Sequence, residues 1–127
     1  MVELIASLLI DLSEQKLYAY NPQHQVVRTM PVSSGRSSSP TPIGASRVLS
    51  KFASVTMRGR GYVTPGVPWV LCINPEATVC LHGAPWQERA GERFGVPRSH
   101  GCVRLPTHQA RWLYERTPLG TPVTIQR

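Results

Sequence analysis

A histidine and a cysteine lie two residues apart in the segment Ser99–Leu105, which reads Ser-His-Gly-Cys-Val-Arg-Leu. A cysteine thiolate is a strong nucleophile near neutral pH, and a neighbouring histidine is a common base for removing the thiol proton. If the segment is extended, His100 and Cys102 lie on the same face and enter the same cleft. A second histidine, His82, lies seventeen residues before Ser99. The pattern predicts a cysteine nucleophile but does not rank the two histidines.

Gly101 separates the histidine from the cysteine. Glycine lets the main chain approach a ligand closely, so the N–H groups of Gly101 and Cys102 could point toward an oxyanion that forms at an attacked carbonyl. The alternative is that Cys102 is a small apolar core residue beside two unrelated histidines. Both His82 and His100 are followed by glycine, and this repeated arrangement favours the nucleophile.

The pair His82-Gly83 and the segment Ser99–Leu105 together resemble the signature of the L,D-transpeptidase catalytic domain family. That signature is a histidine, a gap of similar length, then Ser/Thr-His-Gly-Cys, an aliphatic residue and Asn or Arg. The resemblance extends over nearly the whole chain. It includes an opening strand pair, a Thr-Pro-x-Gly turn, a Gly-Val-Pro segment and a closing strand, at residues 11–18, 40–44, 95–97 and 120–123.

The resemblance implies a role for each catalytic position. Cys102 would attack a carbonyl and form a thioester, and His82 would act as general base and then as general acid. The main-chain carbonyl of Gly83 would orient the His82 ring. His100 would shape the site and polarise the thiol, and Gly101 would donate its N–H to the oxyanion.

Ser99 and Arg104 are the candidate substrate-binding residues. Ser99 would also orient the turn through hydrogen bonds, and its alternative is an ordinary turn serine. Arg104 would hold a substrate carboxylate, and its alternative is a structural salt bridge.

The implied substrate is a peptidoglycan stem peptide. The tetrapeptide would be cleaved after its third residue, and its acyl group would pass to another amine, forming a 3-3 cross-link or attaching a different acceptor. Transfer to water would instead make the protein an L,D-carboxypeptidase. The resemblance implies no cofactor and no metal. It implies an envelope or periplasmic location, although we recognise no signal peptide in the sequence.

The charge balance is strongly basic, with 14 Lys and Arg against 7 Asp and Glu and a net charge of +7. Such a charge predicts an anionic partner. The arginines are scattered singly, and we interpret Arg58-Gly59-Arg60-Gly61 as a solvated turn, so nucleic acid is not the expected partner. A non-catalytic basic wall-binding domain would explain the charge but not the cysteine motif.

Two further interpretations concern the other cysteines. Cys72 and Cys80 flank a turn at residues 75–77 and could face each other as a disulfide, with two buried free thiols as the alternative. A metal site would need a different spacing, because the chain has no Cys-x2-4-Cys or His-x3-5-His pair. The ligand types for such a site are nevertheless present, at Cys72, Cys80, His82, His100 and Cys102.

The length of 127 residues predicts one domain, residues 1–127. Twelve prolines and ten glycines predict many turns, so we expect a mainly β, sandwich-like domain. Leu4–Ile10 is too short to span a bilayer, and it lacks a basic flank and a cleavage site, so we expect it to begin the first strand. That first strand is expected at 8–12, and further strands are expected at 16–20, 25–31, 46–55, 69–74, 77–82 and 123–125.

One helix is expected, at residues 106–116, where apolar residues recur at helical spacing and Pro118 follows. The stretch 33–41 is rich in Ser, Gly and Pro and is expected to be a flexible loop. Residues 84–98 would cross as a polar segment in which Trp86 and Phe94 form a wall or lid of the cleft.

Overall fold

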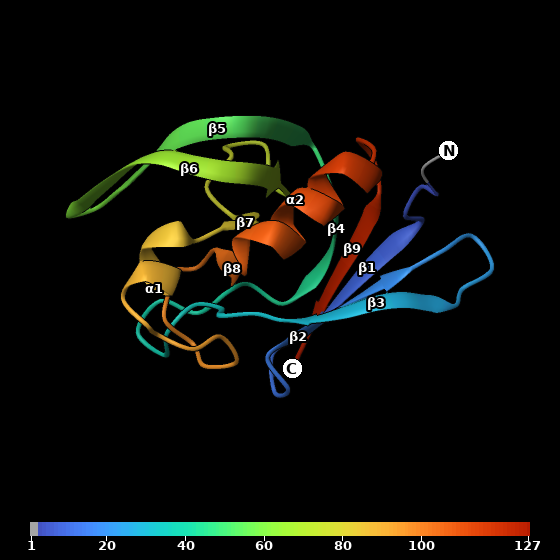
Figure 1. Ribbon diagram of the computed structural model, residues 1–127, viewed down its shortest axis with the longest axis horizontal. Helices are drawn as coiled ribbons and strands as arrows, with labels where there is room; N and C mark the ends of the chain where they lie inside the picture. Colours follow the sequence, from blue (N-terminus) through green and yellow to red (C-terminus); the bar gives the residue numbers. More distant parts are fainter. Residues whose placement is uncertain (1–2) are drawn as a thin grey trace.

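The computed structural model describes residues 3–127, and the fold is mainly β, as predicted (Figure 1). The first sheet has five strands in the order β3-β2-β1-β9-β4. Strand β9 comes last in the chain but lies inside this sheet, parallel to β1 and antiparallel to β4. The strands are β1 (Ser7–Asp11), β2 (Lys16–Tyr20), β3 (Val26–Pro31), β4 (Gly44–Arg47) and β9 (Pro122–Gln126).

The second sheet has four strands in the order β5-β6-β7-β8. Strands β5 and β6 form a long hairpin, and β7 and β8 are parallel. The elements are β5 (Ser50–Gly59), β6 (Tyr62–Cys72), β7 (Cys80–Gly83) and β8 (Val103–Leu105), with the helices α1 (Pro85–Arg89) and α2 (Thr107–Arg116).

One apolar core joins the two sheets through α2. In β1, Leu8 and Ile10 alternate with half-buried residues, as expected for a strand with one face in the core. They belong to the same cluster as Leu113 of α2 and Leu81 of β7. Each such side chain contributes about 1.5–3 kcal/mol when it is fully buried. Figure 1 shows α2 between the β5–β6 hairpin and the five-stranded sheet, so this core fixes the frame on which β7 and β8 lie.

Most predicted elements are confirmed, including the first hairpin, the closing strand and α2. The predicted strand at 46–55 is divided into β4 and β5. Strand β6 is much longer than the strand predicted at 69–74, and its added part contains Pro65 and Pro68. Only its last two residues pair with β7, so these prolines lie where one edge of β6 is free and a missing N–H costs little.

The structure also contains a second helix, α1, in the stretch predicted to be a non-helical crossing. Its five residues are too few to show helical periodicity, and Pro85 occupies its first turn, where proline is well tolerated. None of the helices within residues 3–127 has the length and apolar character needed to cross a membrane.

Candidate active site

The motif residues come together at the β7–β8 pair. His82 of β7 and Arg104 of β8 are register partners. Cys102 precedes Arg104 by two residues, and all three line one pocket of about 80 Å³ together with Ser99 and His100. The predicted sharing of a cleft by His100 and Cys102 is therefore observed, but through a turn rather than an extended strand.

The His82 imidazole is buried and has a defined tautomer. Its Nδ1 lies 2.6 Å from the main-chain oxygen of Gly83, so Nδ1 carries the proton and donates it to that oxygen. Burial, with a smaller effect from the nearby charge of Arg104, lowers the pKa of His82 to about 4 against the raising effect of the Gly83 bond. At neutral pH the ring is therefore uncharged, and its Nε2 lone pair can accept a proton.

Gly83 is required at its position by the packing around it. A Cβ there would lie 3.1 Å from Cγ of Pro68 and 3.3 Å from Cα of Thr107. A larger residue would push these groups away and shift the carbonyl that holds His82. The expected role of the Gly83 carbonyl thus has both the required contact and a steric reason for glycine.

The Cys102 thiol is nearly buried, with 9% of the residue exposed. Its sulfur donates to the main-chain oxygen of Thr78 and accepts from the N–H of Cys80, each over 3.4 Å. Burial raises the pKa of Cys102, whereas the Cys80 N–H and the charge of Arg104 lower it. Because the net shift is upward, the resting site contains a neutral thiol and a neutral imidazole rather than an ion pair.

The turn before Cys102 is held by the buried side chain of Ser99. Its hydroxyl accepts from the N–H of Gly101 over 3.0 Å and donates to the carbonyl of Cys102. This arrangement matches the expected turn-orienting role of Ser99 and leaves its hydroxyl committed to the main chain. The Gly101 N–H, which is predicted to be an oxyanion donor, is therefore bonded to Ser99 in this structure.

The stretch 33–41, predicted to be a flexible loop, supports the other side of the turn. Ser39 Oγ donates to the carbonyl of His100 over 2.6 Å, and Thr41 Oγ1 donates to the carbonyl of Gly101 over 2.7 Å. At Gly35, a Cβ would lie 2.2 Å from the main-chain oxygen of Ser39. The polar residues of this stretch therefore bond to a segment about sixty residues away, and its flexibility stays a prediction.

His100 lies at the mouth of the pocket and is exposed. Its ring stacks on Tyr62 of the β5–β6 hairpin, with 4.3 Å between centroids and 15° between planes. Partial burial lowers the pKa of His100, and the charges of Arg36 and Arg104 act in the same direction. Met57 and Tyr62 of the hairpin also line the pocket, so the hairpin forms one wall of the site.

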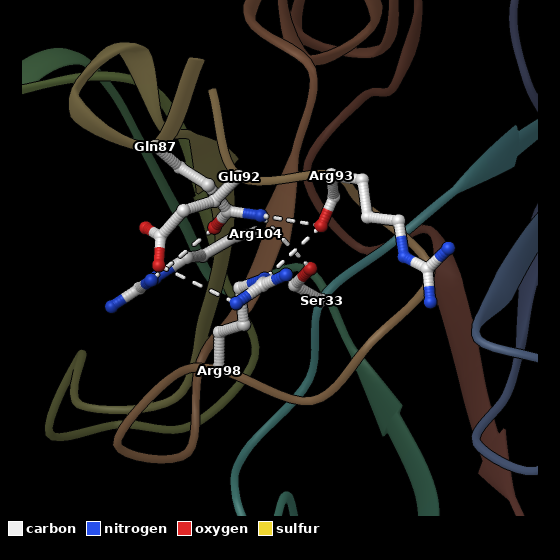
Figure 2. Close-up of polar contacts among 6 residues, drawn as sticks. All are labelled: Ser33, Gln87, Glu92, Arg93, Arg98 and Arg104. Carbon is white, nitrogen blue, oxygen red and sulfur yellow. Dashed lines mark hydrogen bonds and ion pairs between the residues drawn. The ribbon is translucent and has the colours of Figure 1, made fainter. Parts of the chain in front are cut away.

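Arg104 is held by a buried glutamine that the sequence analysis did not identify (Figure 2). Arg104 donates to Gln87 Oε1 over 3.2 Å, and Gln87 Nε2 donates to Ser33 Oγ over 3.1 Å and to the carbonyl of Arg93 over 3.3 Å. The guanidinium also lies 5.4 Å from the ring centre of Trp86. No sequence signal marks Gln87, because its partners lie on three separate segments.

Arg104 has no carboxylate partner among residues 3–127. The neighbouring ion pair joins Arg98 to Glu92 over 3.4 Å and leaves Arg104 out (Figure 2). The alternative of a structural salt bridge for Arg104 is therefore not supported. Arg104 lines the same pocket as Cys102, and burial lowers the pKa of Arg104 there against the raising effect of the nearby charge of Glu92.

A second, larger pocket of about 520 Å³ adjoins the first across the His100-Gly101 turn. Met57, Tyr62 and His100 line both pockets. The far walls of the larger pocket come from four parts of the chain. They are β5 (Phe52 and Val55), the end of β6 (Cys72), the loop before β7 (Glu76–Val79) and the loop before β4 (Pro40 and Pro42).

Cys72 and Cys80 form a disulfide, which confirms the first of the two interpretations of this pair. They are register partners at the end of the β6–β7 pairing. Cys102 is the free cysteine. Within the part of the chain that the structure describes, no group of three or more His, Cys, Asp or Glu residues is placed to hold a metal ion.

Comparison with known proteins gives one consistent result. The profile of the L,D-transpeptidase catalytic domain family matches residues 6–125. L,D-transpeptidase 1 of Mycobacterium tuberculosis is 33% identical over 112 residues, covering 80% of this chain and 43% of the relative. Probable L,D-transpeptidase 3 of the same organism is 35% identical over 106 residues, covering 76% of this chain and 38% of the relative. The chain thus spans less than half the length of these relatives.

Solved structures agree with the sequence comparison. The structure of an L,D-transpeptidase in complex with imipenem has a TM-score of 0.83 and 28% identity, and the match covers 93% of this chain and 57% of that one.

Proposed function

Because the chain belongs to the L,D-transpeptidase catalytic domain family, we propose that it transfers the acyl group of a peptidoglycan stem peptide through a thioester on Cys102. The observation that carries this proposal is the His82 tautomer. With Nδ1–H committed to the Gly83 carbonyl over 2.6 Å, the other ring nitrogen is a base in the pocket that Cys102 lines.

The first half-reaction begins from the neutral pair. As Cys102 Sγ bonds to the carbonyl carbon after the third stem residue, its proton passes to Nε2 of His82. The tetrahedral intermediate then collapses, the C–N bond breaks, and His82 returns the proton to the departing D-alanine amine. A thioester and a neutral imidazole remain.

The second half-reaction reverses these roles. An acceptor amine attacks the thioester carbonyl and gives a proton to His82, and the C–S bond breaks as the proton returns to the sulfur. An amine of a second stem peptide would give a 3-3 cross-link, another amine would give an attached acceptor, and water would give L,D-carboxypeptidase activity.

The oxyanion requires main-chain donors in the Ser99–Cys102 turn. The Gly101 N–H can serve only if it exchanges the Ser99 hydroxyl for the developing charge. Such an exchange favours the transition state, because a charged oxygen accepts a stronger hydrogen bond than a neutral hydroxyl does.

Arg104 supplies the charge for a substrate carboxylate. It is held by Gln87 and Trp86 beside the nucleophile, and the terminal carboxylate of the donor D-alanine is an anion that departs with the leaving group. The basic surface, with a net charge of +7, favours the acidic cell wall in general.

We place the protein in the cell envelope, where its substrate lies. The Cys72–Cys80 disulfide fits an oxidising compartment.

A carbapenem tests the proposal, since its strained lactam carbonyl can take the place of the scissile amide. Intact mass spectrometry and peptide mapping should show one adduct, on Cys102. The adduct should be absent from Cys102→Ala and should form more slowly in His82→Ala. A folded protein that forms no adduct would instead favour the non-catalytic wall-binding alternative. The solved relative whose structure contains imipenem shows that this drug class reaches a site of the same fold.

A further inference from the structure

The Cys102 sulfur takes the place of a main-chain acceptor at the end of a β ladder. Strands β7 and β8 pair in constant register, with His82 opposite Arg104. Extending this register by two residues places Cys80 opposite Cys102. There the N–H of Cys80 donates to the Cys102 sulfur over 3.4 Å. The position of the Cys80 main chain therefore sets one of the polar contacts of the nucleophile.

The second contact comes from the loop immediately before β7. Thr78 offers its carbonyl to the Cys102 sulfur over 3.4 Å. Asn74 shapes this loop, because its Oδ1 accepts from the N–H groups of Thr78 and Val79, each over 3.0 Å. Both partners of the sulfur, Thr78 and Cys80, thus lie in one short segment.

The Cys72–Cys80 disulfide closes that segment onto β6. Strands β6 and β7 share only two register pairs, Leu71 with Leu81 and Cys72 with Cys80. So short a pairing provides few hydrogen bonds, and the covalent bond lies at the end where the loop begins. Without the bond, this end of the pairing is free to fray.

We propose that the Cys72–Cys80 disulfide is a redox-sensitive clamp that holds the Thr78–Cys80 segment against the nucleophilic sulfur, so that the oxidised protein is the more reactive form. The inference rests on the proposed role of Cys102 as the nucleophile. Reduction by a dithiol breaks the S–S bond and leaves two thiols, while the dithiol loses two hydrogens and becomes a disulfide.

The larger pocket, of about 520 Å³, lies beside the bond and is lined by Cys72. Only 1% of Cys72 is exposed. A small dithiol in this pocket therefore attacks the Cys72 sulfur when this end of the pairing opens. A thiolate that attacks the Cys72 sulfur forms a mixed disulfide with Cys72 and releases Cys80, the cysteine of the strand that contacts Cys102.

Loss of the clamp has a defined chemical consequence. The Cys80 N–H stabilises the thiolate of Cys102, so moving it away disfavours ionisation. The thiol would then ionise at higher pH and react more slowly at neutral pH. The other titratable or charged groups around the sulfur are Tyr62 of β6, His82 of β7, His100 of the turn and Arg104 of β8.

The test measures the rate of Cys102 alkylation by iodoacetamide against pH, with the modified residue identified by peptide mapping. Three proteins are compared: the oxidised protein, the protein reduced with dithiothreitol and freed of reductant, and Cys72→Ala/Cys80→Ala. We expect the midpoint of the rate–pH profile to move to higher pH in the reduced protein and in the double variant. The rate at neutral pH should fall roughly tenfold, as for loss of a weak hydrogen bond to a charged group. Dithiothreitol treatment should not change the profile of the double variant.

Two controls separate this clamp from a general effect on stability. Val123→Ala removes core volume at a residue that lines neither pocket, and it should lower the melting temperature without moving the pH profile. Asn74→Ala releases the loop with the disulfide intact and should move the profile in the same direction as reduction. If the double variant does not fold, Asn74→Ala still tests the clamp.

Unchanged profiles in the reduced protein and in Asn74→Ala would overturn the inference and leave the disulfide a purely stabilising bond. Because alkylation needs no peptidoglycan substrate, this result is separate from failure of the transferase proposal. A protein that is alkylated as expected but forms no carbapenem adduct would count against the proposed function and leave the clamp intact.

Discussion

His82 and Arg104 lie directly opposite each other in the parallel pair of β7 and β8. This pairing places a fixed positive charge beside the imidazole. Burial is the main cause of the low His82 pKa, and the guanidinium adds to it. The same guanidinium also favours the Cys102 thiolate. Arg104 thus favours both the uncharged form of His82 and the thiolate form of Cys102.

Arg104→Gln should weaken the use of substrates that end in a carboxylate. A buried charge pair provides strong hydrogen bonds, so we expect KM for a tetrapeptide to rise by about tenfold or more. The same peptide with an amidated terminus should show little change. Arg104→Lys is the matched control and should retain part of the preference. An equal effect on both peptides would argue that Arg104 does not contact the carboxylate.

Removing either catalytic side chain should abolish or nearly abolish turnover. Cys102→Ala leaves no nucleophile, and His82→Ala should lower the rate of D-alanine release by about 10²–10⁴-fold, the usual range for general acid–base catalysis. The double variant should be no worse than Cys102→Ala, because groups that act as a unit are not additive. Thermal melts check that each variant is folded. Release at the wild-type rate by either single variant would remove the assignment.

The buried neutral His82 predicts a loss of stability in acid. Its pKa is about 4 in the folded protein against an ordinary value of 6.5. The unfolded chain therefore binds more protons between these values, and stability falls as pH decreases from 6.5 to 4. The full shift corresponds to about 3 kcal/mol. Urea unfolding of the wild type and of His82→Gln at several pH values measures this loss of stability. The same change of unfolding free energy with pH in both proteins would contradict the prediction.

Thr41 should support the nucleophile turn through its hydroxyl rather than its shape. The hydroxyl accepts from the Gly35 N–H over 2.9 Å and donates to the Gly101 carbonyl over 2.7 Å. Thr41→Val keeps the shape and leaves both groups without a partner, which should cost about 1–3 kcal/mol of unfolding free energy and slow acylation. Thr41→Ser should retain both properties. Denaturant curves and carbapenem acylation rates test this, and a Thr41→Val protein like the wild type would refute it.

Local patterns in the sequence were enough to predict much of this protein. Short apolar runs separated by turn residues predicted the first hairpin, the family resemblance pointed to the closing strand, and helical spacing predicted α2. Residue types and spacing singled out Cys102, His82 and His100. The family resemblance pointed to the Gly83 carbonyl, and the 2.6 Å contact with His82 has the expected geometry.

Only the tertiary structure decided how the site is held. Ser39 and Thr41 bond to the turn of Cys102 from about sixty residues away, and Gln87 joins Arg104 to two other segments. The Gly101 N–H, which is predicted to be an oxyanion donor, is bonded to Ser99. A hydrogen bond between distant segments leaves no periodicity in either one. It depends on where the core brings their main chains together.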